Sequence, residues 1–260
     1  MNEILLTNST GYNELEFDFR NIHQFFFFTT YSPLFLFCQT VWICINLRRF
    51  APRLTWWQSY LLCGFMALSG KYLALFMTYS PSPLLEHPLD IIILSFAWML
   101  VNCSSSDFFY RIMSWNFIFP FFLVLLQIVF CLIQVRSVCF GCDTGSSKYP
   151  SSFTGQFFVA IIYSSMDSFV WMLFLQKSRD FSNRSILRNA AISIIYLYFK
   201  QYPMFFELFE VTEKSLKVYL LIIGLTIVII DDAVFGVLAP KGIDITGLTY
   251  ISRAVTYYGI

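Results

Sequence analysis

The chain has 260 residues, of which 57% are hydrophobic, 20% aromatic and only 13% charged, and its mean hydropathy is +0.64. Soluble domains carry about 25% charged residues, and a globule of this length has too little interior to bury so many Phe, Leu and Ile side chains. The composition therefore excludes an ordinary soluble domain, and a formal net charge of +1 gives no bulk basic field to attract nucleic acid.

Seven apolar segments are long enough, or nearly long enough, to cross a membrane as helices, which takes about 20 residues each. They predict an all-α polytopic membrane protein with spans at residues 25–47, 56–79, 89–101, 117–135, 157–175, 190–206 and 215–238. The third segment is short, and residues 108–110 could continue it at the interface. We expect a membrane domain at residues 23–239, an N-terminal segment at 1–22 and a C-terminal tail at 240–260.

The basic residues between the spans predict their orientation, because Lys and Arg near membrane ends are retained on the cytoplasmic side. With a luminal or extracellular N-terminus, ten Lys and Arg residues lie on the cytoplasmic side, five lie opposite, and Lys71 and Lys200 lie within spans. The cytoplasmic set is Arg48, Arg49, Arg53, Arg111, Lys177, Arg179, Arg184, Arg188, Lys241 and Arg253, and the opposite set is Arg20, Arg136, Lys148, Lys214 and Lys217. This excess predicts a luminal N-terminus and a cytoplasmic C-terminus.

Ionisable side chains at membrane depth are the main functional signal, because each costs about 2.5–3.5 kcal/mol at the centre of a membrane helix. Lys71 lies in the second span, Asp167 in the middle of the fifth and Lys200 in the sixth. Asp231 and Asp232 lie toward the end of the seventh span. Such residues either line a hydrated path or form an internal ion pair, for example Asp167 with Lys71 or Lys200, and the sequence leaves both readings open.

Patterns typical of an enzyme or a metal site do not occur in this sequence. His23 and His87, the only histidines, are not placed among carboxylates and cysteines at ligand spacing, and no glycine-rich phosphate loop is present. Cys139 and Cys142 form a CxxC pair with no second pair to complete a zinc shell, and we expect them in a loop after the fourth span, either reduced or as a disulfide. The sequence predicts no catalytic site and no metal site.

The third span and the residues after it carry a distinctive motif. Ala97-Trp98-Met99-Leu100 is followed, nine positions after the Trp, by Asp107-Phe108-Phe109-Tyr110-Arg111. In spacing and residue types this motif resembles the third-span signature of the trimeric intracellular cation channels, which reads Trp-x-Leu and then Asp-x-Phe-Tyr-Lys.

Two other segments are similar to the same family. Gly70 and Lys71, followed by Pro81, resemble the family's glycine-containing second span and the Gly-Glu-Pro that ends it. Lys200 precedes Pro203 by three positions, as an Arg precedes the Pro of the family's sixth span.

The resemblance implies two inverted three-helix repeats plus a seventh helix, assembled as a homotrimer with one hydrated pore in each subunit. It also implies a location in the endoplasmic or sarcoplasmic reticulum membrane and a flux of monovalent cations, such as potassium, that balances charge during calcium release. On this basis we expect Lys71, Asp167 and Lys200 to border the ion path. We expect Asp107 and Arg111 to fix the cytoplasmic end of the third span.

Departures from the family limit the functional prediction. The family's fourth span carries Lys-Glu-Val-x-x-Arg, whose basic residues hold a phosphoinositide, whereas residues 126–135 of this chain have no basic residue before Arg136. In the fifth span, residues 165–168 replace the family's Lys and closely spaced glycines with Ser-Met-Asp-Ser. The alternatives are a seven-span receptor and a non-conducting structural membrane protein, although the receptor signatures Asp-Arg-Tyr after the third span and Asn-Pro-x-x-Tyr in the seventh do not occur.

Overall fold

The computed structural model describes residues 21–27, 32–78, 88–104, 107–113, 119–174 and 179–238. Its main helices are α2 (Ser32–Phe50), α3 (Trp56–Met77), α5 (Leu89–Asn102), α6 (Phe108–Met113), α7 (Phe119–Lys148), α8 (Phe153–Phe174), α9 (Arg179–Gln201), α10 (Met204–Leu208) and α11 (Glu213–Leu238). Within these ranges the chain forms helices, short turns and no strand, so the all-α prediction is confirmed for them.

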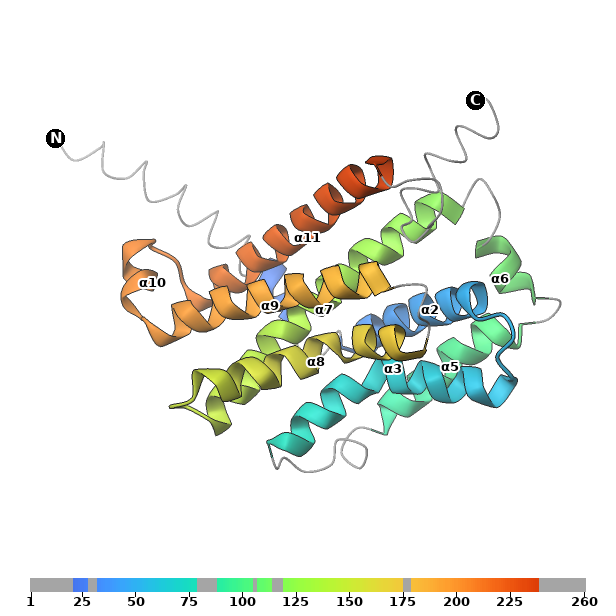
Figure 1. Cartoon of the computed structure of the whole chain (residues 1–260), viewed down its shortest axis with the longest axis horizontal. Coiled ribbons are helices and arrows are strands. Elements are labelled where there is room, and N and C mark those ends of the chain that lie inside the picture. The colour runs from blue at the N-terminus through green and yellow to red at the C-terminus, as the bar shows by residue number, and fades with distance from the viewer. Residues whose placement is uncertain are drawn as a thin grey trace.

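Two groups of consecutive helices lie side by side (Figure 1). The first group contains α2, α3 and α5, and the second contains α7, α8, α9 and α11. Contacts of α3 with α8 and of α2 with α7 join the groups. One hydrophobic core surrounds Trp98 and extends from the first group to residues of α7 and α8, and another surrounds Val135 and Tyr196 in the second group.

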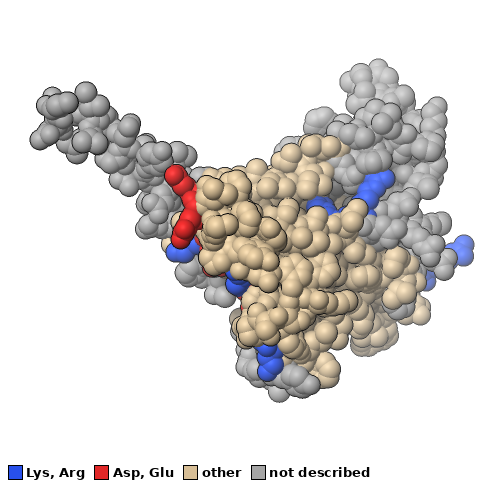
Figure 2. All heavy atoms as spheres, turned by 60° about the vertical axis from the view of Figure 1, so that its left-hand side comes forward, with Lys and Arg blue, Asp and Glu red and all other residues tan. Residues whose placement is uncertain are grey.

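The surface and length of the helices are those of a multi-pass membrane protein. Three helical segments, Trp56–Met77, Ile128–Lys148 and Phe153–Leu173, are long and apolar enough to cross a bilayer, and Asn21–Phe27 with Ser32–Arg48 would make a fourth, bent by 61°. Large apolar side chains face outward, as lipid contact requires, and Figure 2 shows a face with few charged atoms. The arrangement of seven spans as two inverted repeats and a further helix stays a prediction.

Helix α7 extends further than its predicted span, which ended at residue 135. In its polar C-terminal turns the hydroxyl groups are satisfied within the helix: Thr144 Oγ1 donates to Phe140 O at 2.8 Å and Ser146 Oγ to Cys142 O at 2.7 Å. The prediction of a loop for Cys139 and Cys142 is therefore wrong. Both cysteines are buried in α7 and neither forms a disulfide.

Helix α9 also differs from its predicted span, since it begins at Arg179 rather than residue 190 and ends at Gln201 rather than residue 206. The end is set by Pro203, because a proline ring disfavours helical conformation in the residue before it. Pro203 then occupies the N-cap position of the separate short helix α10.

Glycines allow the closest approaches between helices. A Cβ atom on Gly70 of α3 would lie 2.6 Å from Tyr163 O and 2.9 Å from Ile162 O of α8. A Cβ on Gly141 of α7 would lie 2.7 Å from Cα of Ala160, also on α8. Gly64 is different, because its nearest neighbours would be the Leu94 methyl groups at 3.8 Å. Small residues thus set the spacing of α8 from α3 and α7.

We predict that Gly70→Ala destabilises the protein by about 1–3 kcal/mol, because its new methyl group would overlap backbone atoms of α8 that cannot move aside. Thermal unfolding of the detergent-purified protein should show a lower Tm for this variant. Gly64→Ala, in the same helix, is the matched control and should unfold near the wild-type temperature. Equal Tm values for the two variants would contradict the role assigned to Gly70.

Candidate functional site

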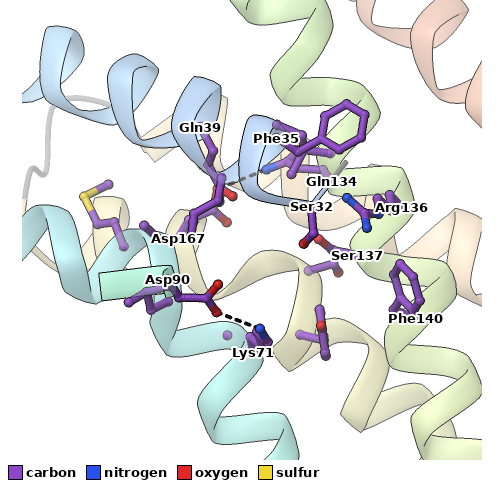
Figure 3. Close-up of a pocket in the computed structure, with 18 of the residues that line it drawn as sticks. Ser32, Phe35, Gln39, Lys71, Asp90, Gln134, Arg136, Ser137, Phe140 and Asp167 are labelled. Carbon is purple, nitrogen blue, oxygen red and sulfur yellow. Dashed lines mark hydrogen bonds and ion pairs between the residues drawn. The ribbon is translucent and has the colours of Figure 1, made fainter. Parts of the chain in front are cut away.

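A cavity of about 410 Å³ lies between α2, α3, α5, α7 and α8 (Figure 3). Its wall is partly apolar, with side chains such as Phe35, Ile133 and Phe140. Four ionisable groups also line it, namely Lys71, Asp90, Arg136 and Asp167, together with the polar side chains of Ser32, Gln39, Gln134, Ser137, Tyr163 and Ser164. A polar, charged cavity inside a membrane domain is where water and ions could enter the fold.

Lys71 forms an ion pair at the wall of this cavity. Its Nζ lies 2.8 Å from Oδ2 of Asp90, and the two side chains are 29% and 16% exposed. Asp90 belongs to the first turn of α5, where the helix dipole favours a carboxylate. The anionic partner of Lys71 is therefore Asp90, not Asp167, and the pair is electrically neutral as a unit.

Asp167 lies deeper and is held by a network that spans three helices. Its Oδ1 accepts from the Ser168 backbone N–H at 2.7 Å, and its Oδ2 accepts from Gln134 Nε2 at 3.2 Å. Gln134 Oε1 in turn accepts from Ser185 Oγ at 2.9 Å and from Arg188. Only 6% of Asp167 is exposed, so a carboxylate from α8 is stabilised by α7 and, through Gln134, by α9.

Two arginines that the sequence analysis assigned to opposite membrane faces lie inside the helical packing. Arg136 is buried in α7 and its guanidinium carbon lies 5.0 Å and 5.2 Å from the ring centres of Phe35 and Phe140, which are cation–π distances. Arg188 lies well within α9, beside Gln134. Both arginines lie within helices because α7 and α9 are longer than the apolar runs from which the spans were predicted.

A buried polar seam between α8 and α9, formed by Ser164, Ser165, Asn189 and Ser193, was missed by the sequence analysis. Asn189 Nδ2 donates to Ser164 O at 3.1 Å and to Ser165 Oγ at 3.0 Å, and Ser193 Oγ donates to Asn189 O at 2.7 Å. The signal was present: Ser185, Asn189 and Ser193 recur every four positions and so share one face of α9.

Lys200 is not among the residues that line the cavity and instead joins a second charged cluster between α7, α9 and α11. Asp143 is its centre, with Lys200 Nζ 2.7 Å from Oδ1 and Lys217 Nζ 2.8 Å from Oδ2. Lys217 also lies 3.0 Å from Glu213, and Tyr196 donates to Asp143 at 2.9 Å. The structure therefore brings Lys71 and Asp167 to one cavity and places Lys200 elsewhere, paired with Asp143.

The motif residues of the third span pack against the end of α2. Trp98 is buried, and its Nε1 donates to Ser59 Oγ at 3.3 Å. Asp107, which has a positive φ of 57°, accepts from Arg48 Nη2 at 3.1 Å. The same guanidinium lies 4.1 Å from the centre of the Tyr110 ring. Arg48 is thus the residue that fixes Asp107 in place.

The remaining motif residues are placed only in part. Phe109 packs against the core around Trp98, and its backbone N–H donates to Ser104 Oγ at 3.2 Å. Arg111 belongs to α6, but its side chain lies outside the described residues, as do those of Asp231 and Asp232 in α11. All of Pro81 lies outside the described ranges.

We predict that Asp143→Asn destabilises the protein by about 1–3 kcal/mol, because it leaves two neighbouring lysines without their shared carboxylate. Lys200→Met should cost less than about 1 kcal/mol, since Asp143 then keeps Lys217 as its partner. Thermal unfolding in the same detergent compares the two variants directly. A larger loss for Lys200→Met would show that Asp143 is not the centre of this cluster.

Neither a scan against protein-family models nor a search of curated proteins found a match for the chain. Solved structures do match. A trimeric intracellular cation channel from C. elegans with bound Ca²⁺ superposes with a TM-score of 0.58 at 14% identity, covering 84% of this chain and 97% of that one. The Ca²⁺-free channel from C. elegans gives 0.57 at 18% identity, with 88% and 99% covered.

A third structure, described as the structural basis for activity of TRIC counter-ion channels in calcium release, has a TM-score of 0.57 at 11% identity and covers 82% of this chain and 98% of its own. The three matches extend over most of both partners, while their sequences have diverged widely from this one. The chain therefore has the fold of the trimeric intracellular cation channels, at low sequence identity.

Proposed function

We propose that the protein is a monovalent cation channel of an intracellular membrane, which supplies counter-ion flux, with potassium as the carried ion, during calcium release from the endoplasmic or sarcoplasmic reticulum. The observation that carries the proposal is the charged cavity with Asp167 in its wall, set in the fold of known cation channels. A buried carboxylate beside a polar cavity attracts cations and replaces part of their hydration shell.

The proposed architecture is a homotrimer of seven-span subunits with a luminal N-terminus and a cytoplasmic C-terminus. Coverage of 97–99% of the matched channel chains supports it. The helix order supports it too, because α2, α3 and α5 form one group of three and α7, α8 and α9 another, with α11 following. This is the order expected of two three-helix repeats and an additional helix.

In the proposed path, cations pass the Lys71–Asp90 pair and reach Asp167. The ion pair keeps one face of the cavity neutral, and the attraction for cations comes from the deeper Asp167 carboxylate, opposed by the positive charge of Arg136 in the same wall. Lys200 borders the path only if the path continues between α8 and α9 along the polar seam toward Asp143. A seven-span receptor is less well supported, because the structures that match over most of this chain are channels.

We predict that Asp167→Asn lowers the potassium current, or its selectivity over chloride, by about fivefold or more, because one unit charge near the ion contributes at least about 1 kcal/mol. Single-channel recording in planar bilayers measures both quantities. Glu207→Gln removes an exposed carboxylate on α10 and is the control that should conduct like the wild type. Currents unchanged in Asp167→Asn would remove this residue from the path, and a silent wild-type trimer would indicate the non-conducting alternative.

The assembly is tested separately by chemical crosslinking in mild detergent. We predict a ladder that ends at three subunits, because the proposed channel is a homotrimer. A monomer that couples to a G protein would instead favour the receptor. Crosslinking does not depend on conduction, so it tests the assembly even if the bilayer recordings are silent.

A further inference from the structure

The amide of Gln134 has only one orientation that satisfies its neighbours. Arg188 can only donate hydrogen bonds, whereas the Asp167 carboxylate can only accept them. Gln134 must therefore present Oε1 to Arg188 and Nε2 to Asp167, which is the arrangement observed. Ser185 strengthens it by donating to the same Oε1 at 2.9 Å. The side chain is thus fixed from both ends by groups on α8 and α9.

Gln134 also lies between the cavity and the polar side chains of α9. It belongs to the wall of the cavity, together with Asp167, whereas Ser185 and Arg188 are not among the lining residues. The dashed contact in Figure 3 joins Gln134 to Asp167, so the two lining side chains are bonded to each other. Only 3% of Gln134 is exposed, so its amide separates the open cavity from the polar groups of α9.

We propose that Gln134 is the gate of the ion path and that Arg188 is the positioning residue that holds it closed. The inference rests on the proposed channel function. A cation that leaves the cavity past Asp167 toward α9 must displace the amide, which requires the Nε2 bond to Asp167 to break. Rotation of the amide frees the carboxylate for the ion, and Arg188 opposes this rotation by holding Gln134 Oε1.

Thiol labelling tests the barrier without any need for conduction. Ser185→Cys places a thiol directly behind Gln134, and a small cationic methanethiosulfonate reagent, read by peptide mass spectrometry, reports access to that one site among the native cysteines. We expect labelling at least tenfold faster when Gln134→Ala is added. Glu207→Gln is the control, because Glu207 is exposed on α10, outside the cavity, and its substitution should leave the rate unchanged.

Bilayer recording tests the consequence for ions. Gln134→Met keeps the side-chain volume but removes all three hydrogen bonds of the amide, so the open probability should rise at least fivefold, and Arg188→Met should raise it in the same direction. Glu207→Gln, outside the cavity on α10, should behave as the wild type. Labelling that is equally slow with Gln134 and with Gln134→Ala overturns the gate, even where the wild type conducts. Faster labelling with no current in any variant supports the barrier and overturns cation conduction instead.

Discussion

The hydrocarbon core of a bilayer offers no water, so an ionisable group in a membrane helix needs a partner inside the protein or a hydrated cavity. Three such groups in the described part of this fold find a partner on another helix. Lys71 of α3 pairs with Asp90 of α5, Asp143 of α7 pairs with lysines of α9 and α11, and Asp167 of α8 bonds Gln134 of α7. Each of these contacts includes a charged side chain that would be costly to leave unpaired. The contacts therefore determine which faces of the helices meet, and the apolar side chains pack around them.

Close backbone approach is the second constraint, and it determines where the cavity lies. Gly70 and Gly141 let α3 and α7 contact the backbone of α8 from two sides. This brings the face of α8 that carries Tyr163, Ser164 and Asp167 toward α3 and α7, where those side chains form part of the cavity wall. Bulkier residues at the two glycine positions would separate the helices and open the polar groups to lipid.

Retention of the fold at 11–18% identity is understandable in these terms. Lipid-facing positions require only apolar bulk, and many residue types supply it. The polar interior has fewer solutions, so differences there carry functional meaning. In this chain a carboxylate occupies the middle of α8, and an amide on α7 and a guanidinium on α9 hold it. In the proposed channel, this arrangement lies at the cavity through which the cation would pass.

The sequence by itself determined the membrane class, the all-α fold, most helix positions and the presence of Lys71 and Asp167 as ionisable residues within membrane helices, because hydropathy and charge are properties of single segments. Tertiary structure alone decided the partners. Lys200 and Asp143 are 57 residues apart, and Gln134 and Arg188 are 54 apart. Arg136 and Arg188 were assigned to the membrane faces because the spans were predicted from apolar runs. Polar residues interrupt such a run, but the helix itself continues through them. Which side chains meet depends on the rotation and crossing of packed helices, and no local pattern in the chain encodes these quantities.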